Sequence, residues 1–146
     1  MTSASWLPPL PTPGRYLSLR RTADGKSIAD VAALLPTDPA TPEHERILQL
    51  ELIEADAQPM TLATIMALRA VYRFDLEVLG RLEAIAQGQD LPPPDLCEQC
   101  GWGTTYDQLY WPVLGLCRPC YAPLSPADIA ARAADRVHPA LRSAAA

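Results

Sequence analysis

All four cysteines of the chain lie in one window, residues 97–120, and they form two C-x-x-C pairs. The pairs are Cys97 with Cys100 and Cys117 with Cys120. Two such pairs in one short window are typical of a site where four thiolates hold one Zn²⁺. Gly101 follows the first pair, where a tight turn benefits from a residue that tolerates positive φ. The pattern therefore predicts one structural Zn²⁺ bound by these four cysteines.

Three other uses of the thiols have to be weighed. A disulfide-exchange site usually places one C-x-x-C at a helix start in a βαβ unit, and neither pair has such surroundings. Two disulfides would suit an oxidising compartment, and free buried thiols are the third option. The N-terminal stretch MTSASWLPPLPTPG lacks the basic and apolar regions of a signal peptide. We therefore expect a cytoplasmic, intracellular protein in which reduced thiols can hold zinc.

Length and composition fit one domain of ordinary size or two small ones. The chain has 146 residues, 49% of them apolar, and no run of about 18 apolar residues that would span a membrane. Its 16 prolines cluster at the boundaries that we expect between segments. We expect a flexible N-terminal arm, a helical bundle, a proline linker, a zinc module and a C-terminal helix with a tail, at residues 1–13, 14–88, 89–95, 96–124 and 125–146.

Capping and breaking signals divide the bundle into five short helices, so the predicted fold class is mainly α. Ser27 and Asp30 form a capping box, and Thr41 is an N-cap candidate with Pro42 in the first helical position. The five helices are expected at residues 14–24, 27–35, 42–55, 62–72 and 76–87. Short strands or loops are expected around the cysteines. A last helix should begin near Ser125 and end at Pro139.

Two stretches of the bundle carry a more specific pattern. YLSLRRTADGKSIADVAALL combines a basic first helix, a glycine turn and a capped second helix. LQLELIEADAQPMTLATIMALRAVYRFDLEVLGRL has Ile53-Glu54 near the end of the third helix, Pro59 and Thr61 before the fourth, and Phe74-Asp75 before the fifth. Over residues 14–86 the chain resembles the helix-turn-helix domain of the Cro and lambda-repressor (XRE) family. The resemblance implies a third helix that lies in the DNA major groove, and a glutamate, here Glu54, that ties the bundle together.

The same resemblance implies a transcriptional regulator that binds double-stranded DNA as a homodimer. Lysine and arginine would bind phosphates, and a glutamine would reach a base edge. The candidate DNA contacts come from the first helix, its turn, the second helix's cap and the third helix: Arg15, Arg20, Arg21, Lys26, Ser27, Arg46 and Gln49. The other interpretation of these residues is an ordinary solvated surface.

The charge of the third helix indicates a second function. The helix carries Glu43, Glu45, Glu51 and Glu54 against the single Arg46, and the net charge of the chain is −5. Carboxylates would repel DNA phosphates, and a DNA-binding domain is usually basic. The alternative is a protein-interaction adaptor for a basic protein or RNA polymerase, such as an antitoxin-like protein or a phage-type modulator. An accessory structural protein with no nucleic-acid role is the third possibility.

Around the cysteines the sequence reads C-x2-C-G, then aromatic residues, then G-L-C-x2-C. This pattern is similar to treble-clef and zinc-ribbon modules, among them GATA-type fingers. The resemblance implies a small zinc finger, and such modules bind proteins as often as nucleic acids. The aromatic residues would pack around the metal or form a stacking or docking surface: Trp102, Tyr106, Tyr110 and Trp111.

We expect no enzymatic activity. Zinc held by four cysteines has no open coordination position for water or substrate. His44 lies in the first turn of the third helix and His138 precedes Pro139, and neither has a neighbouring serine or cysteine with which to form a catalytic pair. A glycine-rich phosphate-binding loop is also missing from the sequence.

Overall fold

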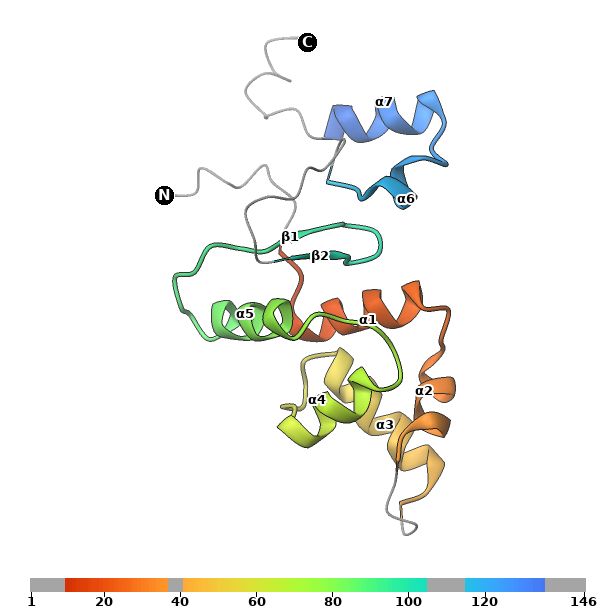
Figure 1. Cartoon of the computed structure of the whole chain (residues 1–146), viewed down its shortest axis with the longest axis vertical. Helices are drawn as coiled ribbons and strands as arrows, with labels where there is room; N and C mark the ends of the chain where they lie inside the picture. Colours follow the sequence, from red (N-terminus) through yellow and green to blue (C-terminus); the bar gives the residue numbers. More distant parts are fainter. Residues whose placement is uncertain (1–9, 37–40, 105–114, 136–146) are drawn as a thin grey trace. The chain divides into compact units, whose positions relative to one another are not determined.

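The computed structural model describes residues 10–36, 41–104 and 115–135 (Figure 1). The chain divides into two compact units, a larger one formed by Pro11–Leu109 and a smaller one formed by Met1–Leu10 with Tyr110–Ala146. Within the described ranges the protein is mainly helical, which confirms the predicted class. Most of the predicted N-terminal arm and the predicted tail beyond residue 135 lie outside the described residues, and the predicted segment boundaries stay predictions.

Five helices build most of the larger unit. They are α1 (Pro13–Ala23), α2 (Ile28–Leu34), α3 (Glu43–Glu54), α4 (Leu62–Arg69) and α5 (Leu76–Ala86). Side chains of Ser27, Thr61 and Asp75 accept hydrogen bonds from first-turn amides and so start α2, α4 and α5 where the sequence predicted. The N-cap of α3 is Pro42 rather than Thr41, because the carbonyl oxygen of Pro42 accepts the first helical bonds.

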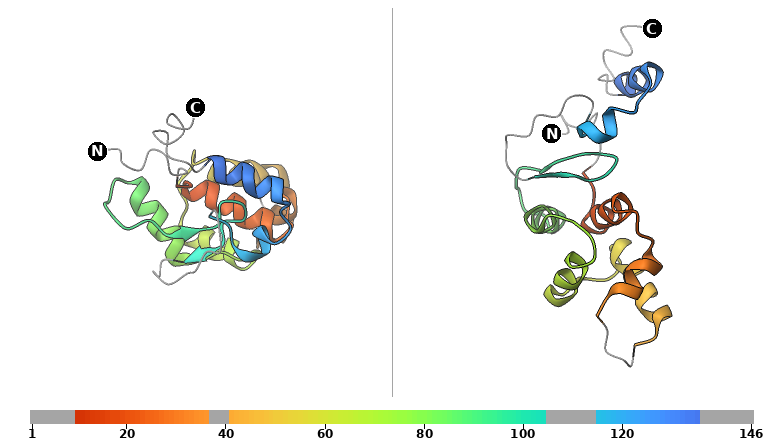
Figure 2. Two further views of the ribbon diagram at one scale, coloured as in Figure 1. Left: turned by 90° about the horizontal axis from the view of Figure 1, so that it is seen from above. Right: turned by 45° about the vertical axis from the view of Figure 1, so that its right-hand side comes forward.

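The apolar core of the larger unit draws on all five helices. α1 contacts both α3 and α5, and α2 packs on α3 (Figure 2). Tyr16 is buried in this core, and its hydroxyl accepts a hydrogen bond of 2.9 Å from the Asp75 amide at the start of α5. The buried core residues are Tyr16, Leu17, Val31, Ala32, Leu50, Ile53, Leu68, Tyr72, Phe74, Val78, Leu79 and Leu82.

Three contacts fix α1 against the C-terminal end of α3 and the residues that follow it. Arg21 and Glu54 form an ion pair in which both guanidinium–carboxylate bonds are short, 2.7 and 3.0 Å. At Gly14 a β-carbon would lie 2.5 Å from the carbonyl oxygen of Ile53, so only glycine allows this approach. The Gly14 amide also donates to the Asp56 carboxylate at 2.8 Å.

A short antiparallel hairpin follows α5 in the described part of the larger unit. Its strands are β1 (Asp95–Leu96) and β2 (Gly103–Thr104), with Asp95 paired to Thr104 and Leu96 to Gly103. β2 contacts α5 (Figures 1 and 2). The connection between the strands spans residues 97–102, and its turn, residues 97–101, contains the first cysteine pair.

The smaller unit contains α6 (Arg118–Tyr121) and α7 (Pro126–Asp135) among its described residues. Ser125 caps α7 as predicted, because its hydroxyl accepts from the Asp128 amide while the Asp128 carboxylate accepts from the Ser125 amide, both at 3.1 Å. The predicted stop at Pro139 lies outside the described residues. None of the helices in the described ranges combines the length and the apolarity that crossing a membrane requires.

Candidate metal centre and interaction surface

The first cysteine pair is held in the hairpin turn by backbone hydrogen bonds. The Cys97 amide donates to the Trp102 carbonyl at 2.7 Å, and the Gly101 amide donates to the Cys97 carbonyl at 2.8 Å. Gly101 has a φ of 73°, as the sequence predicted. The Trp102 amide lies 3.4 Å from the Cys100 sulfur and donates to it, a bond that stabilises a thiolate at this position.

The second pair lies at the start of α6. Cys117 is the N-cap residue of this helix and Cys120 belongs to its first turn. The amides of Cys120 and Tyr121 both donate to the Cys117 carbonyl, at 3.1 and 3.0 Å. Residues three apart in a helical turn lie on one face, so both sulfurs of this pair point the same way.

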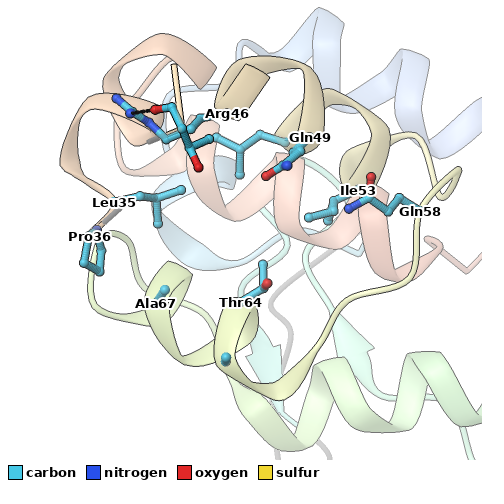
Figure 3. A pocket seen from close by; sticks show the side chains of 11 residues that line it. Leu35, Pro36, Arg46, Gln49, Ile53, Gln58, Thr64 and Ala67 are labelled. Atoms are coloured by element: carbon cyan, nitrogen blue, oxygen red, sulfur yellow. Dashed lines mark hydrogen bonds between the residues drawn. The ribbon is translucent and has the colours of Figure 1, made fainter. Parts of the chain in front are cut away.

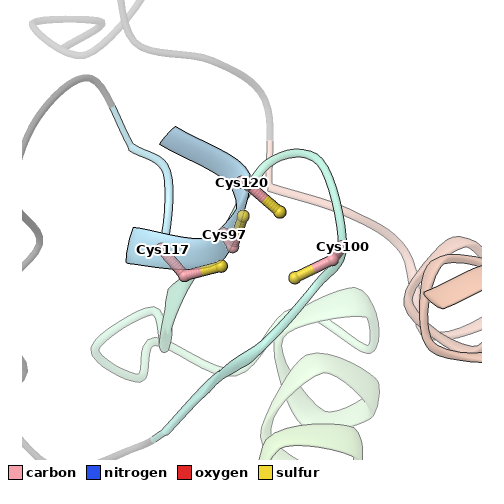
Figure 4. Close-up of side chains that lie close together, drawn as sticks. All are labelled: Cys97, Cys100, Cys117 and Cys120. Carbon is pink, nitrogen blue, oxygen red and sulfur yellow. The ribbon is translucent and has the colours of Figure 1, made fainter. Parts of the chain in front are cut away.

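The four cysteine sulfurs form one cluster in which all of them lie within 4.8 Å of one another (Figure 4). Zinc–sulfur bonds of about 2.3 Å in a tetrahedron place sulfurs about 3.8 Å apart, which this cluster can accommodate. All four cysteines are described, and none forms a disulfide. Cys97 and Cys117 are buried, while Cys100 and Cys120 are half-buried. The cluster can therefore bind a metal ion, as predicted.

Arg20 connects the first cysteine turn to the helical bundle. Its side chain is only 9% exposed. Its Nε donates to the carbonyl oxygen of Arg73, and its Nη1 donates to the carbonyl oxygen of Cys100, both at 3.0 Å. Sequence analysis proposed Arg20 for phosphate contact and missed this role, because no local pattern relates residue 20 to residue 100.

Three other candidate DNA contacts are also engaged within the fold. Arg21 pairs with Glu54 and donates to the Lys26 carbonyl at 2.8 Å. Arg46 donates to the carbonyl oxygens of Ala32 and Thr41, at 3.1 and 2.8 Å. The Ser27 hydroxyl accepts the Asp30 amide as the N-cap of α2. These side chains therefore hold turns and helix ends together.

The remaining candidates lie at the surface of the larger unit. Arg15 is exposed, Lys26 is half-buried, and Gln49 is exposed on α3. DNA contact by any of the seven residues stays a prediction. Of the predicted aromatic cluster, Trp102 is 48% exposed, whereas Tyr106, Tyr110 and Trp111 lie outside the described residues. His44 is exposed, and His138 lies outside the described residues.

The solvent-facing side of α3 is acidic and apolar. Glu43, Glu45 and Glu51 are exposed, and Leu48 between them is 54% exposed. The single arginine of α3, Arg46, is half-buried and bonded to two carbonyl groups. The sequence analysis did not single out Leu48 as an exposed apolar residue. The helical spacing could have predicted that Leu48 is exposed, because this residue lies off the face formed by Leu50 and Ile53.

A cavity of about 290 Å³ opens between α3 and α4 (Figure 3). Gln49 and Ile53 line it from α3, and Ala63, Thr64 and Ala67 line it from α4. The α4 side chains that face the cavity are small, and Leu68 is the buried residue that joins α4 to the core. The two helices are therefore loosely packed against each other at this point.

No family model, no curated protein and no solved structure matches the chain. The resemblances to the XRE domain and to treble-clef or zinc-ribbon modules therefore stay predictions.

Proposed function

We propose that this protein is a protein-interaction adaptor that binds a basic partner through α3 and uses its cysteine cluster to hold one structural Zn²⁺. The observation that carries the proposal is the exposed side of α3, where Glu45, Leu48 and Glu51 form an acidic and apolar surface. We call these three residues the α3 surface. Carboxylates around an exposed leucine suit a protein surface with basic residues around an apolar contact.

The distribution of cations supports a protein partner over DNA. Specific DNA binding depends on arginine and lysine side chains that are free to reach phosphates and base edges. Arg20, Arg21 and Arg46 are instead bonded to carbonyl groups or to Glu54. Carboxylates at the α3 surface would oppose a phosphate backbone. The partner class that fits is a basic protein, and a basic segment of RNA polymerase has this chemistry.

Zinc is the proposed metal because four thiolate donors select zinc or iron, and zinc is the usual ion of small structural sites with four cysteine ligands. An ion with four cysteine ligands has no open coordination position. Its role would be to supply folding energy to the short segments that carry the cysteines, since binding energy at such a site is folding energy.

A second candidate is DNA binding of the XRE type. The observation that favours it is that α1 and α2 both pack against α3, an arrangement expected of a helix-turn-helix domain. Arg15 at the start of α1 and Lys26 in the turn between α1 and α2 would then supply phosphate contacts.

Site-specific photo-crosslinking distinguishes the two candidates. A photoreactive amino acid replaces Leu48 in the full chain, within cells that produce the protein. Leu91, an exposed residue of the segment before β1, is replaced as the matched control. We expect the Leu48 probe to crosslink to a protein segment of net positive charge. We expect the paired changes Glu45→Gln and Glu51→Gln to reduce this crosslink.

Crosslinks to DNA from position 48 would contradict the adaptor proposal and support the second candidate. Equal crosslinking from positions 48 and 91 would also contradict it, because the α3 surface would then have no preference for a partner.

A further inference from the structure

The turn that carries Cys97 and Cys100 is packed on α1. A β-carbon at Gly101 would lie 3.1 Å from Cβ of Leu19 and 3.5 Å from Cδ1 of Tyr16. The backbone of the turn therefore lies directly against α1, with no side chain between them. A change in the conformation of the turn would therefore disrupt its packing against α1, because close-packed surfaces do not deform without loss of contact.

Arg20 makes this contact energetically important. Its buried guanidinium uses the Cys100 carbonyl as one of two acceptors. If the turn unfolds, Nη1 loses that acceptor and the desolvated cation is left with an unsatisfied donor, which is costly. The native conformation of the turn and the native position of Arg20 therefore stabilise each other.

The second acceptor of Arg20 ties the same network to α5. The Arg73 carbonyl accepts from Nε of Arg20, while the Arg73 amide donates to the Asp24 carboxylate at 2.9 Å. The Tyr16 hydroxyl accepts from the Asp75 amide at the start of α5. The metal-binding turn, α1 and the start of α5 are thus joined through one buried cation and its neighbours.

The residue after Arg20 carries the connection to α3. Arg21 makes two hydrogen bonds to Glu54, in the last turn of α3. α1 therefore bonds to the cysteine turn through one arginine and to α3 through the next. The α3 surface belongs to a helix whose position α1 helps to set.

We infer that metal binding at the cysteine cluster stabilises the whole helical bundle through Arg20. Metal binding thereby regulates the fraction of molecules that can bind the partner at the α3 surface. The effect on the partner rests on the proposed function, whereas the coupling between metal and bundle does not. A ligand that binds only the folded turn stabilises everything that the folded turn stabilises. By the same linkage, the packing of α1 against the turn raises the affinity of the turn for metal.

Hydrogen exchange of the full chain, with Zn²⁺ bound and after its removal by a chelator, tests the coupling without any substitution. We expect zinc removal to increase exchange of amides in α1 and α5 as well as in residues 97–101. Faster exchange confined to the cysteine segments, with α1 and α5 unchanged, would overturn the inference.

The substitution Arg20→Met tests the route. Arg69→Met is the matched control, because Arg69 is exposed at the end of α4. Competition with a chromogenic zinc chelator should show that Arg20→Met lowers zinc affinity about tenfold while Arg69→Met leaves it unchanged, a factor within the range of ordinary coupling energies. Equal zinc affinity in both variants would show that Arg20 does not transmit the effect and would overturn the inference.

Crosslinking at Leu48 then separates the inference from the proposed function. We expect the protein crosslink to weaken when zinc is removed. A crosslink that persists in zinc-free protein with unchanged exchange in α1 would leave the adaptor function standing and overturn the regulation. Coupling seen by exchange and chelator competition, without any crosslink at Leu48, would overturn the adaptor function and leave the coupling intact.

Discussion

Arg21 and Glu54 form a bidentate ion pair between α1 and α3, with Nε–Oε1 and Nη2–Oε2 distances of 2.7 and 3.0 Å. Their side chains are 14% and 13% exposed, so water screens the pair only weakly. Removing one partner of such a pair leaves a poorly hydrated charge behind. The pair is therefore a sensitive point at which to test the arrangement of the two helices.

We expect Arg21→Ala to lower the free energy of unfolding of the bundle by about 2 kcal/mol, because the substitution leaves the Glu54 carboxylate without its cationic partner. Urea unfolding followed by circular dichroism measures the change. Arg15→Ala is the control, because Arg15 is exposed on the same helix and should change stability by less than about 0.5 kcal/mol. Similar losses in the two variants would show that the pair does not hold α1 against α3.

Two buried tyrosines predict a loss of stability at alkaline pH. Burial raises the pKa of Tyr16, and burial together with the Glu54 charge raises the pKa of Tyr72. Above about pH 10 the tyrosines of the unfolded chain lose protons that the folded chain keeps, so stability falls as pH rises. Below that pH this contribution is fully present.

Thermal unfolding from neutral pH to beyond pH 10 measures this dependence. Each tyrosine contributes a slope of up to about 1.4 kcal/mol per pH unit. Tyr72→Phe should make the alkaline decline shallower than in the unchanged chain. An identical decline in both proteins would mean that Tyr72 does not contribute to it.

Filling the cavity between α3 and α4 should stabilise the bundle. Ala67 lines this cavity from α4, so Ala67→Leu adds apolar atoms where packing is loose. We expect a gain of about 0.5–2 kcal/mol, typical of cavity-filling substitutions. Ala86→Leu, at the exposed end of α5, is the control and should have little effect. A drop in melting temperature for Ala67→Leu alone would show that the added side chain does not fit the cavity.

The cysteine cluster predicts one Zn²⁺ in each purified, reduced chain. Elemental analysis should find this stoichiometry, and Cys100→Ser should reduce it. Gln99→Ala changes the same turn without touching a sulfur and should keep the metal. Iron in place of zinc would refute the identity of the ion, and metal-free protein would refute the site.

DNA affinity gives an independent check on the adaptor proposal. We expect no retention of random-sequence duplex DNA at physiological salt, because the α3 surface is acidic and three arginines are bonded within the fold. Gel shifts over a range of salt concentrations measure this. Tight binding that the paired changes Arg15→Ala and Lys26→Ala abolish would favour the DNA-binding candidate instead.

Local signals in the sequence predicted the helices well. Ser27 with Asp30 and Ser125 with Asp128 act as caps in the structure because a capping box involves residues only three apart. The cysteine spacing likewise identified the cluster, since metal ligands are constrained in both residue type and separation.

Long-range pairing could not be predicted in the same way. Arg20 bonds to the Cys100 carbonyl, and that acceptor is a backbone group with no residue signature. Arg46 bonds to the carbonyl oxygens of Ala32 in α2 and of Thr41 before α3, which the sequence did not predict, and its contact with phosphate stays a prediction. A solvated arginine and an arginine bonded to backbone carbonyl groups look alike in sequence, and only the folded structure shows which acceptors each one reaches.

The glycine at the start of α1 also limits how the protein can be altered. Because an added methyl group at Gly14 would overlap the Ile53 carbonyl, a randomised library at this position should return glycine almost alone. A fluorescent label or affinity handle at that point would push α1 away from α3. Surface positions such as Leu91 are better places for attachment.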